Sequence, residues 1–183
     1  MPNLSASLLL ITILILLSGC QPPPSGESAG WKSPYLYWQL RKETLSQPLT
    51  IPVEGVTQRQ LNDTWGASRS AGRKHEGIDI FAQRGTPVLS ATQGIIRNIG
   101  TNNLGGKVIW VTGPELSQHY YAHLEEYAEH IQEGDWVEAG EVIAYVGNTG
   151  NAKTTPPHLH YGIYFSGQGA TNPYPYLKAE ELE

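Results

Sequence analysis

Short apolar runs, each closed by a turn, dominate the sequence from Leu49 onward and limit the folds that it can adopt. The runs are rich in β-branched and aromatic residues, and Gly, Asn and Asp recur between them about every 8–15 residues. Such spacing is typical of antiparallel strands in a sandwich or an open barrel. The candidate strands are residues 78–82, 86–91, 94–99, 107–112, 118–123, 142–146 and 159–165. No long amphipathic helix interrupts residues 60–175, so the sequence predicts a mainly β protein.

A short helix is predicted ahead of the strands. Ser33 can cap it and Pro34 suits its first turn, and apolar residues follow at roughly helical spacing as far as Leu45. We therefore expect a helix over about 34–45, within an N-terminal helix and connecting segment at 31–59. The strands predict one domain at 60–175, and residues 176–183 would form a C-terminal tail.

An apolar run begins close to Met1. Residues 8–17 read LLLITILILL, which is too short to span a bilayer but has the length of a signal-peptide core. The run ends in Leu17-Ser18-Gly19-Cys20, which resembles the lipobox of bacterial lipoproteins. That resemblance implies a lipoprotein signal peptide at 1–19, lipidation of Cys20, and a Pro/Gly/Ser tether at 20–30. Simple secretion remains the alternative, because residues 1–7 carry no Lys or Arg.

The lipobox resemblance also implies a location. Several acyl chains anchor a protein stably in a membrane, where one chain alone binds only marginally. Position 21 is Gln rather than Asp, which by Gram-negative sorting rules favours the outer membrane. We therefore expect a lipid-anchored protein of the bacterial cell envelope, on the periplasmic face of the outer membrane.

Charge and cysteine content exclude two classes of protein. The formal net charge is −5 and the pI is near 5.7, whereas a protein that neutralises phosphates is normally basic, so we expect no nucleic-acid partner. The single cysteine excludes an internal disulfide framework and any metal site with several thiolates.

Two pairs of residues have the spacing of metal ligands on strands. His158 and His160 are two residues apart at the start of a predicted strand, so both imidazoles point to the same face. His75 and Asp79 are four apart, and they also share a face if the segment is extended. Gly77 argues against a helix there, so this is not the helical zincin motif. Two histidines with one carboxylate are a common catalytic zinc set, with the fourth position left for water.

A third histidine, His123, ends the predicted strand at 118–123. Hydrolysis of an amide needs a base or proton shuttle, and a donor for the developing oxyanion. His123 could fill either of these roles. The competing interpretation is an ordinary surface or core histidine, since a bare His-x-His pair is weak support for a metal site.

Six motifs occur together over about residues 60–175. They are His75-Glu-Gly-Ile-Asp79-Ile, Gly85-Thr-Pro-Val88, Tyr121-Ala-His123-Leu124, Gly134-Asp-Trp-Val137, Gly147-Asn-Thr-Gly150 and Pro157-His158-Leu-His160. In this order they resemble the lysostaphin/LytM-type zinc metallopeptidases. The resemblance implies a twisted antiparallel β-sheet core with a groove across one face, and hydrolysis of amide bonds in peptidoglycan peptide cross-links.

The same resemblance implies a role for each motif residue. One zinc ion would be bound by His75, Asp79 and His160. His123 and His158 would be the catalytic histidines, one activating or orienting the water and the other stabilising the oxyanion, and the sequence leaves open which does which. His119 and His130 match no motif position, so we expect them on the surface.

Substrate contacts are less well defined. Three residues are candidates for substrate binding, Arg69, Arg73 and Tyr161. The two arginines precede His75 and could meet a carboxylate of an acidic stem peptide, and the competing interpretation is that both are solvated loop cations. Tyr161 stands where a Phe is commoner and would add a hydroxyl near the site. The tyrosines and tryptophans are expected mostly in the core, although some could line the groove and stack on sugar or peptide.

Three other functions stay open from the sequence. The first is a non-hydrolytic module of the same fold that binds the cell wall or activates an amidase, and the intact motif positions argue against it. The second is a peptidase for Gly-rich proteins or bacteriocin-like peptides. The third is a structural envelope protein without a metal. A protein regulator is compatible with any of them and leaves no signature in the sequence.

Overall fold

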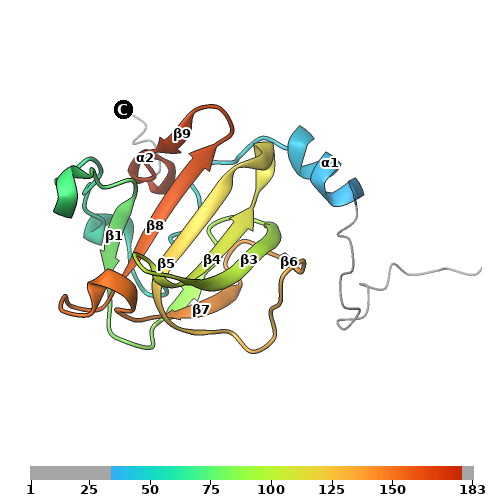
Figure 1. Ribbon diagram of the computed structural model, residues 1–183. Helices are drawn as coiled ribbons and strands as arrows, with labels where there is room; N and C mark the ends of the chain where they lie inside the picture. Colours follow the sequence, from blue (N-terminus) through green and yellow to red (C-terminus); the bar gives the residue numbers. More distant parts are fainter. Residues whose placement is uncertain (1–33, 179–183) are drawn as a thin grey trace, which may run out of the picture.

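The computed structural model describes residues 34–178, and these form one antiparallel sheet with short helices at its margins (Figure 1). The sheet order is β1-β8-β5-β4-β3-β6, while β7 pairs with both β2 and β5, and β9 pairs with β8. The strands are β1 Ile78–Phe81, β2 Pro87–Leu89, β3 Gly94–Asn102, β4 Gly106–Thr112, β5 Gln118–Tyr127, β6 Trp136–Val137, β7 Val142–Val146, β8 His158–Phe165 and β9 Gly169–Thr171. The helices are α1 Pro34–Lys42 and α2 Tyr174–Leu177, and the 3-10 turns are η1 Gln58–Gln60, η2 Ser70–Gly72, η3 Pro114–Leu116 and η4 Gly150–Ala152. The predicted mainly β fold with an open antiparallel sheet is confirmed.

The two faces of the sheet differ because side chains alternate along each strand. One face carries fully buried residues such as Ile109, Tyr121 and Ile163, and they form the hydrophobic core. Further core residues come from two other places. The segment after α1 supplies Leu49, and helix α2 supplies Leu177. The opposite face of β1, β8, β5 and β4 is open and bears the site described below.

Several predicted element boundaries move in the structure. The N-terminal helix ends at Lys42, three residues before the predicted end, because Leu45 leaves the helix to pack in the core. Strands β6 and β9 were not predicted, since two or three residues are too few to show alternation. The expected C-terminal tail, residues 176–183, begins too early in the chain, because Leu177 is fully buried.

His119 is fully buried, so the prediction of a surface position is wrong. The Ser117 hydroxyl donates to the Pro114 carbonyl (2.6 Å) and therefore accepts from His119 Nε2 (2.9 Å). Nδ1 of His119 then accepts from the Tyr161 hydroxyl (2.7 Å). Burial lowers the pKa of His119 to about 3, so the ring is neutral. The other unassigned histidine, His130, is exposed as predicted.

The predicted signal peptide, lipidated Cys20 and tether lie outside the described residues. Within residues 34–178, no helix has the length and apolar character needed to cross a membrane.

Candidate active site

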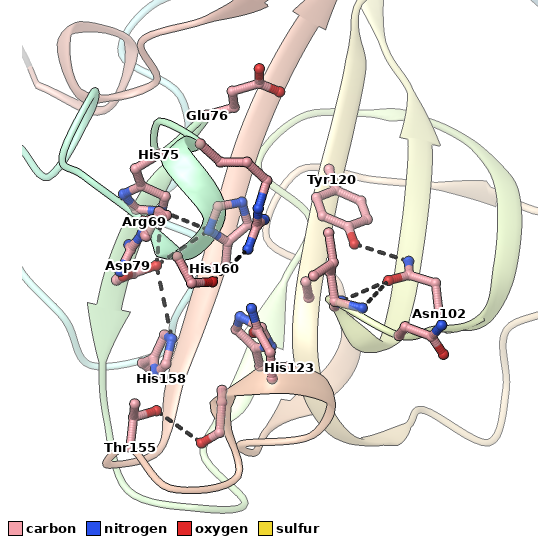
Figure 2. A pocket seen from close by; sticks show the side chains of 18 of the residues that line it. Arg69, His75, Glu76, Asp79, Asn102, Tyr120, His123, Thr155, His158 and His160 are labelled. Carbon is pink, nitrogen blue, oxygen red and sulfur yellow. Dashed lines mark hydrogen bonds and ion pairs between the residues drawn. The ribbon is translucent and has the colours of Figure 1, made fainter.

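A cluster of two histidines and one aspartate lies on the open face of the sheet (Figure 2). Asp79 of β1 is directly paired with His160 of β8, and His75 lies just before β1. Asp79 Oδ1 is 3.1 Å from His75 Nε2 and 3.2 Å from His160 Nδ1, and the two nitrogens are 2.8 Å apart. The structure thus brings together three of the predicted site residues. Strand β1 begins at Ile78, where the predicted strand begins, and His75 precedes it.

The donor atoms of this cluster fit a tetrahedral metal ion. Zinc with nitrogen and oxygen ligands at about 2.0–2.2 Å places neighbouring donors roughly 3.3–3.5 Å apart, somewhat longer than the 2.8–3.2 Å between the donors here, so a small outward shift of the rings would accommodate the ion. His75 Nδ1 donates to the Thr64 carbonyl (2.7 Å), which leaves the lone pair on Nε2 facing the cluster. Burial lowers the pKa of His160 and so favours the neutral ring that a metal requires.

Asp79 is held as a carboxylate by its neighbours. Burial alone would raise the pKa of Asp79, but its polar contacts with His160, His75 and Arg69 outweigh burial and place that pKa well below its usual range. Arg69 Nη2 donates to Oδ2 of Asp79, so Oδ1 is the oxygen that faces the two histidines. The backbone N–H of Asp79 donates to the Thr64 hydroxyl (3.0 Å), which fixes the start of β1 beside the same loop that holds His75.

Close packing around position 77 explains why the first motif contains a glycine there. A Cβ at this position would lie 2.7 Å from Cε1 of His160 and 2.5 Å from the Tyr161 carbonyl oxygen. Real Cβ atoms do not approach so closely, so any larger residue would displace the His160 ring or strand β8. The glycine therefore allows His160 to reach Asp79.

His123 and His158 face the cluster from its open side (Figure 2). His158 Nε2 is 3.8 Å from Asp79 Oδ1, and the ring centroids of His123 and His158 are 5.0 Å apart. Each Nδ1 donates to a backbone carbonyl, His123 to Thr149 (2.9 Å) and His158 to Pro156 (2.8 Å). Both Nε2 atoms therefore carry lone pairs that can accept a proton.

His123 reaches the groove through an unusual backbone. Its neighbour Ala122 is paired with His160 and already lines the open face, so regular alternation would send His123 into the core. The φ angle of His123 is +64°, in the left-handed region that L-residues rarely adopt, and this turns the side chain back to the groove. Burial, followed by the nearby His158 and His160, lowers the pKa of His123 to about 4. Strain at a single residue in such a site is typical of functional positions.

The histidines and Asp79 line a groove with a volume of about 900 Å³. Its walls are the loop at 69–76, the β3–β4 turn at 102–105, and the β7–β8 connection that includes Thr155 and Pro156. Arg73 lines the first wall, where its Nη2 donates to the Ser70 hydroxyl (3.1 Å). Within the described residues Arg73 has no ion pair, whereas Arg69 is paired with Asp79.

Tyr161 is not part of the groove, so its prediction as a substrate-binding residue is wrong. Its side chain is fully buried on the core face, and its hydroxyl is hydrogen-bonded to His119. The reason is alternation, because Tyr161 follows the groove-facing His160 on the same strand. Three of the other aromatic residues, Trp110, Tyr120 and Tyr164, do line the groove.

Two exposed apolar residues of the groove were missed from the sequence. About half of each side chain is accessible, 55% for Phe81 and 50% for Leu104. The Phe81 ring centroid is 5.2 Å from that of His158. Alternation could have identified Phe81, since it is two residues beyond Asp79, whereas the turn that carries Leu104 has no periodic signal.

Two imidazoles and one carboxylate that converge in an open groove are the ligand set of catalytic, rather than structural, metal sites. With two more histidines beside them, the fold and the site have the features of a hydrolase of the peptidase class. Comparison with known proteins agrees, because the sequence profile of peptidase family M23 matches residues 73–173. The chain belongs to peptidase family M23.

Individual relatives support this assignment. The chain is 42% identical over 142 residues to the L-Ala--D-Glu endopeptidase of Bacillus subtilis, a match that covers 72% of this chain and 43% of that protein. It is 35% identical over 113 residues to lysostaphin of Staphylococcus simulans, covering 59% and 22% of the two chains. The crystal structure of the catalytic domain of lysostaphin, an antimicrobial peptidase from Staphylococcus simulans, superposes with a TM-score of 0.59 at 32% identity, covering 67% of this chain and 96% of that one. The matches span less than half the length of these curated relatives.

Proposed function

We propose that the protein is a zinc-dependent endopeptidase that hydrolyses amide bonds in the peptides of peptidoglycan. The observation that carries the proposal is the convergence of His75, Asp79 and His160 in an open groove, with two more imidazoles in reach. A structural metal site would instead be closed by four protein ligands. The peptidoglycan substrate is supported by the Bacillus relative, whose name describes cleavage at an L-Ala–D-Glu bond.

In this proposal His75, Asp79 and His160 hold one zinc ion. When bound, zinc supplies a Lewis acid that lowers the pKa of water to about 7 and polarises a carbonyl. The lone pairs on Nε2 of His123 and His158 accept the proton released when water attacks the amide carbonyl. A protonated Nε2 can then donate, either to the oxyanion or to the departing amine. Arg69 orients Asp79 by binding its second oxygen.

Arg73 is the proposed contact for a substrate carboxylate. It lies on the groove wall, its guanidinium is held by Ser70, and among the described residues no carboxylate neutralises it. A planar guanidinium binds a carboxylate through two parallel hydrogen bonds. Acidic residues of a stem peptide would therefore be favoured next to the bond that is cleaved.

The envelope location remains a proposal that rests on the sequence. A lipid on Cys20 would hold the peptidase domain on the membrane next to the wall, on the periplasmic face of the outer membrane. Replacing Cys20 with Ala should then release the protein from the membrane fraction. Retention of the variant in that fraction would contradict the lipid anchor.

A digest of purified peptidoglycan tests the proposed activity. The full-length, zinc-loaded protein is compared with His160→Ala and with His130→Ala, a matched histidine variant on the exposed surface. We expect new peptide termini with the parent and with His130→Ala, and none with His160→Ala. Mass spectrometry identifies the bond, so loss of cross-linked dimers would support cleavage of the cross-links. An unchanged wall with folded, zinc-loaded parent would favour the non-hydrolytic module.

A further inference from the structure

Three aromatic side chains lie beside the cluster and have no role in the chemistry proposed above. Trp110 of β4, Tyr120 of β5 and Tyr164 of β8 are partly buried and line the groove. The centroid of the Trp110 ring lies 4.5 Å from that of Tyr120 and 5.3 Å from that of Tyr164. We call these three residues the aromatic platform.

The strand register puts the three rings on one surface. Trp110 and Tyr120 are direct partners across β4 and β5, and Tyr120 is the partner of Gly162 on β8. A Cβ on Gly162 would lie 3.0 Å from the Tyr164 ring, so the absence of a side chain allows that ring to lie across the strand. Their sequence neighbours Ile109, Tyr121 and Ile163 are fully buried in the core, which leaves the platform on the open face.

The platform adjoins the proposed metal site. The ring centroid of Tyr120 is 5.9 Å from that of His160, so one ring of the platform lies directly beside a residue of the cluster. Strand β4 is two positions from β8 in the sheet, and Trp110 is level with Gly162, two residues beyond His160, so its backbone lies roughly 12 Å from that of His160. One substrate molecule can therefore place a group on the platform while the bond to be cleaved lies at the cluster.

The chemistry of the platform is amphipathic. The ring faces are apolar, and polar groups stand at their edges. The Tyr120 hydroxyl accepts from the Asn102 amide (3.2 Å), and the Tyr164 hydroxyl donates to the Glu76 carbonyl (3.4 Å). A pyranose ring is built in the same way, with an apolar C–H face and hydroxyls at its rim. The stem peptides of peptidoglycan carry mostly small or charged side chains, so the sugar is the part of that substrate with a broad apolar face.

We infer that the aromatic platform is a saccharide subsite that binds the sugar ring to which the substrate peptide is attached. The inference rests on the proposed function, because it takes the peptide and the sugar as parts of one substrate. An extended peptide adds about 3.3–3.6 Å per residue. The sugar can therefore reach the platform only when the bond at the cluster lies within the first residues of the peptide. Sugar binding on the platform thus favours cleavage of such a bond over cleavage of the more distant cross-link.

A pair of matched substrates tests the subsite with the full-length, zinc-loaded protein. One is a muropeptide with its disaccharide, and the other is the same peptide without sugar. Stacking on an aromatic ring contributes about 0.5–1.5 kcal/mol, so we expect the parent to prefer the muropeptide by about two- to tenfold in kcat/KM. In Trp110→Leu this ratio should fall to about one. Tyr164→Leu is the second platform variant, in case Trp110→Leu does not fold.

Tyr176→Leu is the control, because Tyr176 pairs with Phe165 and does not line the groove. It should keep the preference of the parent. Equal kcat/KM for both substrates in the parent would overturn the subsite and leave the peptidase intact. If neither substrate is cleaved, the proposed function fails, and an NMR titration with a peptide-free glycan oligosaccharide decides the subsite separately. Saturable binding that the platform variants abolish supports it, and no binding overturns it.

Discussion

His160 Nδ1 lies 2.8 Å from His75 Nε2, although 85 positions separate the two residues in the chain. The pairing of β1 with β8 produces this contact, because Asp79 and His160 are direct partners across the two strands. The metal site therefore depends on strand register, and a slip of one residue would turn His160 away from the groove.

Gly77→Ala should weaken zinc binding. The added methyl would meet the His160 ring and push it away from Asp79. Groups that orient metal ligands are typically worth 10–100-fold in affinity, so we expect a loss of about that size in a competition titration with a chelator. Gly100→Ala is the matched control, since its Cβ would make only an ordinary contact at 3.5 Å with the Asn98 side chain. Equal zinc affinity in both variants would contradict this role of Gly77.

His123→Asn should retain zinc and lose most of its turnover. Asn tolerates the positive φ of this position better than most residues, so the variant tests the imidazole rather than the backbone. General acid–base or oxyanion groups contribute about 10²–10⁴ in rate, and kcat should fall by that factor. Turnover close to that of the parent would remove His123 from the mechanism.

Arg73→Gln should raise KM for substrates with a carboxylate near the bond that is cleaved. A hydrogen bond to a charged group contributes about 1.5–3 kcal/mol, which corresponds to an increase of at least tenfold. Zinc content should not change, because Arg73 makes no contact with Asp79 in the structure. Arg59→Gln, on an exposed turn, is the charge-matched control. The prediction fails if amidation of the substrate carboxylate raises KM equally in the parent and in Arg73→Gln.

Buried His119 should make the fold sensitive to acid. Its pKa is about 3 in the folded state, against an ordinary value of 6.5, so the unfolded chain binds the extra proton. The free energy of unfolding is therefore unaffected by His119 above pH 6.5. It falls by up to about 1.4 kcal/mol per pH unit as the pH falls from 6.5 toward 3. Urea unfolding of the metal-free protein should show a shallower decline between pH 6.5 and 5 in His119→Gln than in the parent. Parallel curves would show that His119 does not account for the acid sensitivity.

Alternation along strands was enough to predict much of the site from the sequence. It placed His158 and His160 on one face, and the motif resemblance supplied the ligand set that the structure brings together. It could not predict that His123 turns back to the groove, because that depends on one left-handed residue. The motif resemblance, rather than alternation, misplaced His119 and Tyr161, whose mutual hydrogen bond pairs two polar side chains from different strands inside the core. Such a pair becomes visible only when the register of β5 and β8 is known.

The zinc content of purified protein tests the central claim most directly. After dialysis against metal-free buffer, we expect about one zinc per chain in the parent and in His130→Ala, and far less in His160→Ala. A near-stoichiometric zinc content in His160→Ala, or a folded parent that binds no zinc, would contradict the assignment of His75, Asp79 and His160 as the metal site.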